Sequence, residues 1–445
     1  MAPDGWSRTR LGDLAEIKHG WPFKSEFFNP DLTGHPIVVS IGNFTYTGGF
    51  RFESTTTKEY RSSYPKSFEL SPGDILLVMT CQTVGGEILG IPAKVPDDGR
   101  LYLHNQRLGK VSIKDSKKVS ADYLYWVFLW REFNRELVRT ATGSKILHTA
   151  PARIEAFTLD LPPVREQAAI AQVLGTLDDK IELNRRMNET LESIARELFK
   201  SWFVDFDPIR AKAESRETGL PEHLFDLFPD SFEDSELGMI PKGWRIQHFS
   251  DISNLNAQTL GREDFLEAID YIEISEVMRG NIGTITRYER GSEPSRARRR
   301  LRHGDTVLST VRPDRGAYFL CLEPPETLIA STGFVVLSPR QDHWAFLYLA
   351  LTQDSVGKEL GRLADGGTYP AIRPETVGGL LVVEPTDALL NAFELSARPL
   401  LIRMEENRHQ MKTLAALRDT LLPKLVSGEL RIKDAERILE TASNA

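Results

Sequence analysis

The stretch LDDKIELNRRMNETL, residues 177–191, decides the fold because a similar stretch, LLIRMEENRHQMKTL, returns at residues 400–414. Both have apolar residues at helical spacing, and each places an asparagine, Asn184 or Asn407, among them and follows it with arginine. A polar residue in an apolar seam costs stability, but it fixes the register of two paired helices. The sequence therefore predicts two long helices of similar pattern that pack on each other as a coiled coil.

The first long helix is expected to start after LPPV, residues 161–164, because prolines prevent a helix from extending further towards the N-terminus. Up to residue 203 it would contain about 39 residues and extend roughly 58 Å, more than one DNA turn of about 34–36 Å. A simpler alternative is that both asparagines are solvated at the edge of a loose seam. The residues expected to set the register are Leu177, Ile181, Asn184, Leu191 and Leu198, matched by Leu400, Met404, Asn407, Leu414 and Leu421.

The long helices end two copies of a longer repeat. LSPGDILLVMT (70–80) is echoed by LRHGDTVLSTV (301–311). TGSKILHTAPARIEAFTLDLPPV (142–164) is echoed by DGGTYPAIRPETVGGLLVVEPTD (365–387), which aligns Gly143 with Gly366 and Pro162 with Pro385. Because the echoes keep one order along the chain, they indicate an internal repeat with a pseudo-two-fold relation between its halves.

Each half is expected to contain an α+β domain followed by its helix. DILLVM (74–79), TLIASTGFVVLS (327–338) and GGLLVVE (378–384) are typical of strands, and ADYLYWVFLWREFNRELV (121–138) of one amphipathic helix. Residues 207–243 are rich in proline, glycine and acids and predict an ordered but irregular linker. The expected order is a domain at 1–160, a helix at 161–206, the linker, a domain at 244–387, a helix at 388–430 and a tail at 431–445.

Composition favours a cytoplasmic globular protein. The 445 residues are 41% hydrophobic, contain two cysteines, and show neither a membrane-spanning run nor an N-terminal signal pattern. The net charge of -8 argues against a nucleic-acid partner at first sight. However, residues 161–243 alone hold 10 Lys and Arg against 17 Asp and Glu, while RYERGSEPSRARRRLR (287–302) is strongly basic. Local charge decides where a polyanion binds, so DNA stays a possible partner.

Motifs for catalysis are missing from the sequence. There is no GxxxxGK[ST] loop for ATP, no [DNS]PP[FYW] loop of a base-flipping methyltransferase and no HExxH metal motif. We therefore expect a protein without catalytic residues, cofactor or metal of its own. Two other classes stay open: a coiled-coil scaffold that only joins proteins, and an enzyme with an unfamiliar site.

The order of these segments resembles the specificity subunits of type I restriction-modification systems. The resemblance covers essentially the whole chain and rests on LPPVREQAAIAQVLGTLDDKI (161–181), ARELFKSWFVDFDPIRAKAE (195–214), LFPDSFEDSELGMIPKGW (227–244) and LRDTLLPKLVSGEL (417–430). Two departures occur in the second half. Its helix is led by EPTDALLNAFELSA instead of the LPPxxEQ pattern, and the loop that matches TGS reads DGGTYP.

The resemblance implies a non-catalytic DNA reader. Each domain would be a target recognition domain that binds one half of a split double-stranded DNA sequence. The helices would form an antiparallel coiled coil that sets the gap between the half-sites and docks two methyltransferase subunits, and restriction subunits would complete the nuclease. S-adenosylmethionine, ATP and Mg²⁺ would then be bound by those partners, in the cytoplasm of a bacterium or archaeon.

Candidate DNA contacts are polar side chains on glycine-containing loops, since a few side chains read base edges while basic residues hold the backbone. The alternatives are turn residues that satisfy the local backbone and, for the arginine cluster, a solvated loop. The candidates in the first domain are Thr80, Gln82, Thr83, Asn105, Gln106, Arg107, Thr142, Ser144, Lys145 and His148. Those in the second are Arg298, Arg299 and Arg300 for phosphates, with Thr310, Arg312, Arg315, Tyr318, Thr368 and Tyr369.

Overall fold

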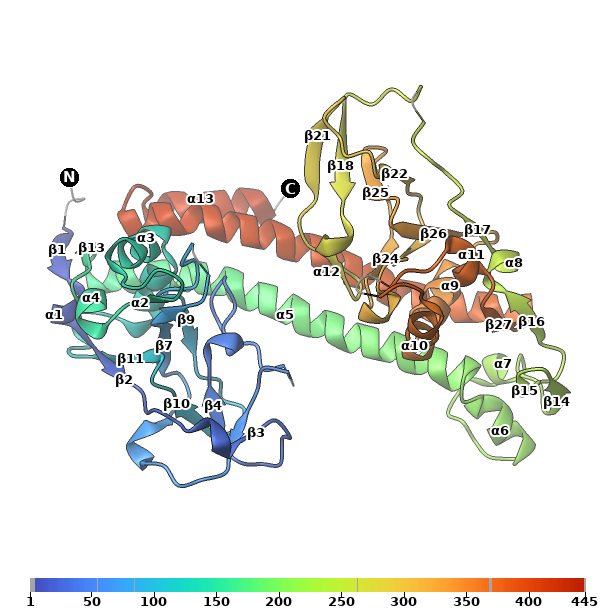
Figure 1. Cartoon of the computed structure of the whole chain (residues 1–445), viewed down its shortest axis with the longest axis horizontal. Helices are drawn as coiled ribbons and strands as arrows, with labels where there is room; N and C mark the ends of the chain where they lie inside the picture. The colour runs from blue at the N-terminus through green and yellow to red at the C-terminus, as the bar shows by residue number, and fades with distance from the viewer. Residues whose placement is uncertain (1–4, 54, 84, 262, 368–369, 444–445) are drawn as a thin grey trace. The chain divides into compact units, whose positions relative to one another are not determined.

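The structure is a computed structural model that describes residues 5–443, apart from 54, 84, 262 and 368–369. The chain divides into two compact units, each with its own core. Unit 1 contains Met1–Glu182 and Met411–Ala445, and unit 2 contains Leu183–Gln410. Figure 1 labels many of the helices and strands of both units.

Unit 1 contains a four-stranded sheet in the order β2-β11-β7-β9 and a five-stranded sheet in the order β3-β5-β4-β10-β6. Two-stranded pairs, β1 with β13 and β8 with β12, complete it. Its strands are β1 Ser7–Arg10, β2 Ala15–His19, β3 Phe28–Asn29, β4 Ile37–Val39, β5 Glu59–Tyr60, β6 Glu69–Leu70, β7 Ile75–Val78, β8 Thr80–Cys81, β9 Pro92–Lys94, β10 Tyr102–His104, β11 Leu108–Ile113, β12 Leu147–His148 and β13 Thr158–Leu161. Its helices are α1 Leu11–Leu14, α2 Ala121–Leu129, α3 Arg131–Thr140, α4 Pro151–Glu155 and α13 Ile432–Ser443, with the short 3-10 helices Ser25–Phe27, Ile41–Asn43 and Lys66–Phe68.

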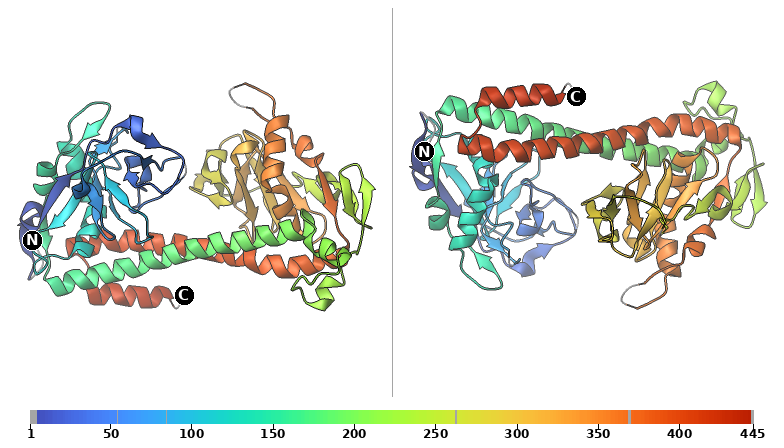
Figure 2. Two further views of the ribbon diagram at one scale, coloured as in Figure 1. Left: turned by 90° about the horizontal axis from the view of Figure 1, so that it is seen from below. Right: turned by 90° about the horizontal axis from the view of Figure 1, so that it is seen from above.

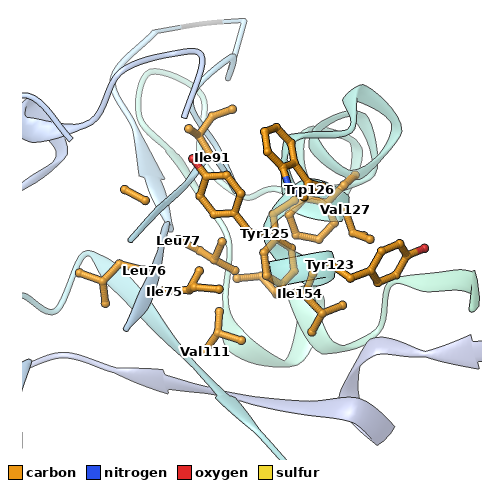
Figure 3. Packing of buried hydrophobic residues seen from close by; sticks show 14 of the residues in the cluster. Ile75, Leu76, Leu77, Ile91, Val111, Tyr123, Tyr125, Trp126, Val127 and Ile154 are labelled. Carbon is orange, nitrogen blue, oxygen red and sulfur yellow. The ribbon is translucent and has the colours of Figure 1, made fainter. Parts of the chain in front are cut away.

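The core of unit 1 forms where α2 packs on the four-stranded sheet. All four residues of β7 are buried, and six of the nine residues of α2 are buried as well. Figure 3 shows Tyr125 of α2 beside Leu77 of β7 and Ile91. A strand with both faces covered reads as a continuous apolar run, which is why DILLVM was recognisable from sequence.

Unit 2 repeats this topology. The sheet β17-β26-β23-β24 corresponds to β2-β11-β7-β9, and β21-β18-β25-β22 corresponds to β5-β4-β10-β6. The one parallel strand pair of each described unit falls at the same place, β18 with β25 and β4 with β10. The strand order therefore confirms the internal repeat of an α+β domain.

The strands of unit 2 are β14 Phe232–Ser235, β15 Gly238–Pro241, β16 Arg245–His248, β17 Ser253–Leu255, β18 Ala268–Ile272, β19 Val277–Met278, β20 Asn281–Ile282, β21 Thr286–Glu289, β22 Ala297–Arg300, β23 Asp305–Ser309, β24 Tyr318–Cys321, β25 Leu328–Ser331, β26 Phe334–Pro339 and β27 Leu381–Glu384. Its helices are α6 Asp207–Ala213, α7 Glu222–Phe225, α8 Phe249–Ile252, α9 Trp344–Leu351, α10 Asp354–Leu363 and α11 Pro374–Gly378, with the 3-10 helices Ile274–Glu276 and Pro313–Arg315.

Two sequence expectations need correction. Residues 121–138 form two helices, α2 and α3, because Trp130 between them has an extended backbone, with φ -69° and ψ 127°. The Trp130 ring packs edge-on against Phe157, 6.5 Å away, so tertiary packing holds the break in a stretch without glycine or proline. The linker at 207–243 is also more regular than expected, since it contains α6, α7 and the hairpin of β14 and β15.

The two long helices are α5 Val164–Phe203 and α12 Asp387–Ser427. In unit 1, Leu174 and Leu177 from the first part of α5 share a core with Leu421 and Leu425 from the last part of α12. In unit 2, the end of α5 shares a core with the beginning of α12. The helices are thus antiparallel (Figure 1). In unit 1, α13 folds back along them and buries Ala435 (Figure 2).

Each long helix is tied to its own domain near its N-terminus. Gln167, fully buried in α5, accepts a hydrogen bond from the Ser120 backbone N–H at the start of α2 and donates to the backbone oxygens of Lys118 and Pro162. In unit 2, buried Glu394 of α12 accepts hydrogen bonds from the backbone N–H groups at the start of α9. Glu394 therefore fills the role of Gln167, although EPTDALLNAFELSA lacks the LPPxxEQ pattern.

Candidate nucleic-acid interface

Three loops of unit 1 meet around the backbone of Met79. The Met79 N–H donates to the Arg107 carbonyl at 3.0 Å, and the Thr149 N–H donates to the Met79 carbonyl at 2.9 Å. Strand pairing places His148 opposite Thr80. The segments 80–83, 105–107 and 142–148, far apart in sequence, thus form one surface, which we call loop cluster 1.

The tight reversal within 142–148 depends on Gly143. Its φ is +104°, in the region that favours glycine, and a Cβ there would collide with the carbonyl oxygen of Ile146. The backbone groups of Thr142 and His148 bond to each other in both directions across this reversal. The glycine that aligned the two halves in sequence is thus required by the geometry.

The predicted side chains of loop cluster 1 divide into a supporting set and an exposed set. Thr80 is buried, and its hydroxyl lies 3.1 Å from Nδ1 of His148. Half-buried Asn105 accepts a hydrogen bond from the Arg107 backbone N–H at 3.1 Å, as expected of a turn residue. Thr83 donates to Glu87, and Thr142 accepts from Arg153. The exposed candidates are Gln82, Thr83, Gln106, Arg107, Thr142, Ser144, Lys145 and His148.

Unit 2 brings the corresponding loops together in the same way. The Thr310 N–H donates to the Gly333 carbonyl at 2.9 Å, and the Ile372 N–H donates to the Thr310 carbonyl at 2.9 Å. Ala371 pairs with both Val311 and Asp365, and Gly366 has a φ of +110°, close to that of Gly143. We call the described segments 310–316, 331–333, 365–367 and 370–371 loop cluster 2.

The predicted side chains of loop cluster 2 differ in accessibility. Arg315 is exposed, and Arg312 is half-buried with a left-handed backbone, φ +48°. Thr310 is buried, and its hydroxyl donates to the Gly333 carbonyl at 2.8 Å. Tyr318 is buried too, and its hydroxyl accepts a hydrogen bond from Arg196 of α5 at 2.7 Å. Tyr318 therefore supports the loops from inside; Thr368 and Tyr369 lie outside the described residues.

The arginine cluster lies on β22, which is a strand and not a solvated loop. β22 begins beside loop cluster 2, because the Thr332 N–H donates to the Arg296 carbonyl at 2.8 Å. Arg298, Arg299 and Arg300 are half-buried, and Arg300 forms an ion pair with Asp264 at 3.3 Å. Burial lowers the pKa of Arg299, and its Nε has no hydrogen-bond partner among the described residues.

The two seam asparagines are buried in unit 2, at 4% exposure for Asn184 and 0% for Asn407. They do not bond to each other. Asn184 donates to Gln410 at 3.2 Å, and Asn407 donates to Asn188 at 2.8 Å. Each asparagine thus bonds to a polar residue of the opposite helix, so neither is solvated at the edge of the seam.

The remaining register candidates lie on the same side of the helices. Leu177, Met404 and Leu421 are buried. Ile181, Leu191, Leu198, Leu400 and Leu414 are half-buried. In unit 1, an ion pair between Arg418 of α12 and Asp178 of α5, at 2.5 Å, adds a polar contact that the apolar pattern did not predict.

Across the part of the chain that the structure describes, no group of three or more His, Cys, Asp or Glu side chains could hold a metal ion. Cys81 and Cys321 are both buried and unpaired with each other, and burial raises the pKa of the Cys321 thiol. Among the same described residues, no helix is long and apolar enough to cross a membrane.

Arg196 is a residue that the sequence analysis missed. Besides its bond to Tyr318, it donates to Glu192, four residues earlier on α5. The only sequence signal was this Glu–Arg spacing, which is common on solvated helix faces.

Comparison with known proteins shows which proteins this chain resembles. A family model described as the type I restriction modification DNA specificity domain matches residues 3–193. The specificity subunit of type I restriction enzyme MjaIX from Methanocaldococcus jannaschii is 26% identical over 443 residues, covering 97% of this chain and 95% of that protein. The HindI specificity subunit from Haemophilus influenzae is 27% identical over 338 residues, covering 62% and 70%.

A crystal structure of the S subunit of a type I system from M. genitalium shares the fold, with a TM-score of 0.60 at 16% identity and coverage of 95% of this chain and 96% of that one. Residues 3–193 match the type I restriction modification DNA specificity domain, and over 97% of its length the chain is similar to a specificity subunit of a type I restriction enzyme.

Proposed function

We propose that this chain recognises a split DNA sequence, with unit 1 reading one half-site and unit 2 the other. The observation that carries the proposal is the pair of loop clusters, which have the same backbone geometry at the same place in two copies of one topology. Each copy thereby presents exposed polar side chains from three loops on one surface.

The side chains suit the task and differ between the clusters. Gln82, Gln106 and Arg107 can bond to base edges through two atoms at once, as amides do to adenine and arginine to guanine. Loop cluster 2 offers Arg312 and Arg315 instead. Because the two residue sets differ, the two half-sites differ in sequence and the target is asymmetric.

The arginines of β22 contribute phosphate contacts in this proposal. Arg299 has no ion pair with a carboxylate among the described residues, and Arg298 lies at the irregularity of β22 between Ala297 and Arg299. Such contacts fix the position of the DNA without reading its bases.

The long helices have two roles in this proposal: they set the spacing between the half-sites, and they dock two methyltransferase subunits, to which restriction subunits are added. The buried asparagines support the spacing role because a change of register would leave them unpaired. S-adenosylmethionine, ATP and Mg²⁺ belong to those partners, and the assembly works in the cytoplasm of its host. The predicted boundaries of the two target recognition domains, 1–160 and 244–387, form part of the same proposal.

The test is to coexpress the chain with the methyltransferase subunit encoded beside it and to map methylated adenines across the host genome. We expect one motif made of two short specified blocks separated by a fixed unspecified gap. If a stable complex forms but methylation is absent or scattered, the chain is a scaffold and the proposal fails.

A further inference from the structure

Arg196 of α5 makes a contact that the DNA-reading proposal does not use. It is a half-buried residue of unit 2, and all of its donor nitrogens have partners. Its Nε donates to Glu192 at 2.9 Å, one terminal nitrogen to the Thr352 carbonyl at 3.0 Å, and the other to the Tyr318 hydroxyl at 2.7 Å. An arginine held at three points has a fixed position.

The Tyr318 contact fixes the end of a loop in loop cluster 2. Tyr318 is the first residue of β24 and lies two residues after the end of 310–316, the segment that carries Arg312 and Arg315. Its ring packs 6.2 Å from that of Tyr348. Because the buried hydroxyl accepts its hydrogen bond from Arg196, the strand cannot shift here without breaking a charge-assisted bond.

The Thr352 contact fixes the opposite side of the same loop. Thr352 lies at the junction between α9 and α10, and Gly361 of α10 packs closely on Asp314. A Cβ on Gly361 would lie 2.9 Å from that of Asp314, which shows how tightly α10 supports the loop. Arg196 therefore holds both the strand after the loop and the helix beside it.

Unit 1 differs at the corresponding position. The repeat aligns Asp305 with Asp74, and therefore Leu308 with Leu77. Leu308 pairs with Tyr318, whereas Leu77 pairs with Pro92, so Pro92 is the counterpart of Tyr318 in unit 1. Proline has neither a hydroxyl nor an N–H to offer. The Arg196–Tyr318 bond is thus a feature of the second copy.

We propose that Arg196 is a positioning residue for DNA specificity, which holds the 310–316 loop in the conformation that reads the second half-site. This inference rests on the proposed function. It assigns a role in sequence discrimination to a residue of α5 that belongs to neither loop cluster. It also predicts an asymmetry: the half-site read by unit 2 depends on this residue, and the half-site read by unit 1 does not.

The test is genome-wide adenine methylation mapping of the coexpressed complex with four variants. Arg196→Ala removes the three bonds, Tyr318→Phe removes one oxygen atom and should leave the fold intact, and Arg196→Lys keeps the charge but loses the planar fork. Arg185→Ala changes an exposed arginine of α5 and is the matched control.

For Arg196→Ala and Tyr318→Phe, we expect the specified block read by unit 2 to accept non-cognate bases at least tenfold more often, with the other block unchanged. Arg196→Lys should lie between these variants and wild type, and Arg185→Ala should match wild type. A wild-type motif in both Arg196→Ala and Tyr318→Phe, at full or reduced methylation, would overturn the inference because it shows a structural role alone. A wild-type chain without any split motif would instead overturn the proposed function.

Discussion

His104 shows how a single residue can link pH to the shape of loop cluster 1. It ends β10, directly before the turn that carries Asn105, and its side chain is buried. Its Nε2 lies 2.9 Å from the Leu108 carbonyl oxygen, so the neutral ring donates a hydrogen bond across the turn. Burial lowers the pKa of His104 from 6.5 to about 4, although the hydrogen bond to Leu108 opposes the shift.

Unit 1 should therefore begin to lose stability as soon as the pH falls below about 6.5. Below pH 6.5 the unfolded chain binds a proton at His104 that the folded chain does not bind until about pH 4. Stability is fully present above pH 6.5 and is lost as pH falls towards 4, by at most about 3 kcal/mol. Urea unfolding of the intact chain at pH 7.5, 6.5 and 5.5 measures it.

The variant His104→Gln can still donate to the Leu108 carbonyl but cannot be protonated, so its stability should fall less between pH 6.5 and 5.5. His35→Gln, at an exposed histidine of unit 1, is the control and should behave as wild type. An unchanged pH slope in His104→Gln would rule His104 out as the titrating group.

At the scale of single residues, the sequence indicated where glycine turns lie but not which polar side chains beside them point outward. The sequence correctly marked glycine-containing loops, and Gly143 and Gly366 are indeed required by their backbone conformations. Thr310 and Tyr318 look equally polar in sequence, yet both side chains are buried and bonded to the protein. Which way a side chain points depends on its partners in space, and Arg196 lies 122 residues from Tyr318.

At the scale of elements, periodicity predicted what local sequence controls. The two long helices and the strand β7 were recognisable because their apolar spacing is regular. The break between α2 and α3 was not, because Trp130 adopts its extended backbone in a stretch without glycine or proline. The sequence also did not reveal that Glu394 plays in unit 2 the role of Gln167 in unit 1, since the two residues occupy different turns of their helices.

The contact between Asn188 of α5 and Asn407 of α12 leads to a prediction at the scale of elements. Asn407 donates to Asn188, while its own Oδ1 is buried with no hydrogen-bond partner among the described residues. Replacing both by leucine removes the unpaired acceptor, so Asn188→Leu with Asn407→Leu should stabilise unit 2 by about 1–3 kcal/mol. Asn407→Leu alone should gain less because it leaves Asn188 without its donor.

Urea unfolding of the wild type, the two single variants and the double variant gives the coupling between the asparagines. Ser193→Leu, at an exposed position of α5, controls for added hydrophobic surface. Additive effects of the two single variants would contradict the pairing of Asn188 with Asn407.

At the scale of the whole molecule, the net charge of -8 hides the feature that matters for DNA. The residues from 161 to 243 carry much of the negative charge, whereas β22 presents three consecutive arginines beside loop cluster 2. Averaging over the chain removes this contrast. DNA responds to the local potential, which is screened within about 10 Å at 0.1 M salt.

Changing Arg298, Arg299 and Arg300 together to alanine should weaken DNA binding by the methyltransferase complex. It should also flatten the dependence of log K on log salt by roughly 2, since each phosphate contact contributes about 0.9 and Arg300 is partly neutralised by Asp264. Titration of target DNA at several salt concentrations measures both. Arg216→Ala with Lys242→Ala, two exposed cations of the linker, should leave the slope unchanged. Unaltered affinity and slope in the triple variant would exclude β22 from the DNA contact.

In each copy of the repeat, the strand that opens the domain pairs with the strand that closes it: Ser7 lies opposite Leu161, and Arg245 lies opposite Glu384. Paired residues are only about 5 Å apart, so the first and last residues of each domain lie close together. Recombination with breakpoints in these strands would replace everything between them and leave the start of the following helix in place. New specificities can thus arise in evolution one half-site at a time, without any change in the helices.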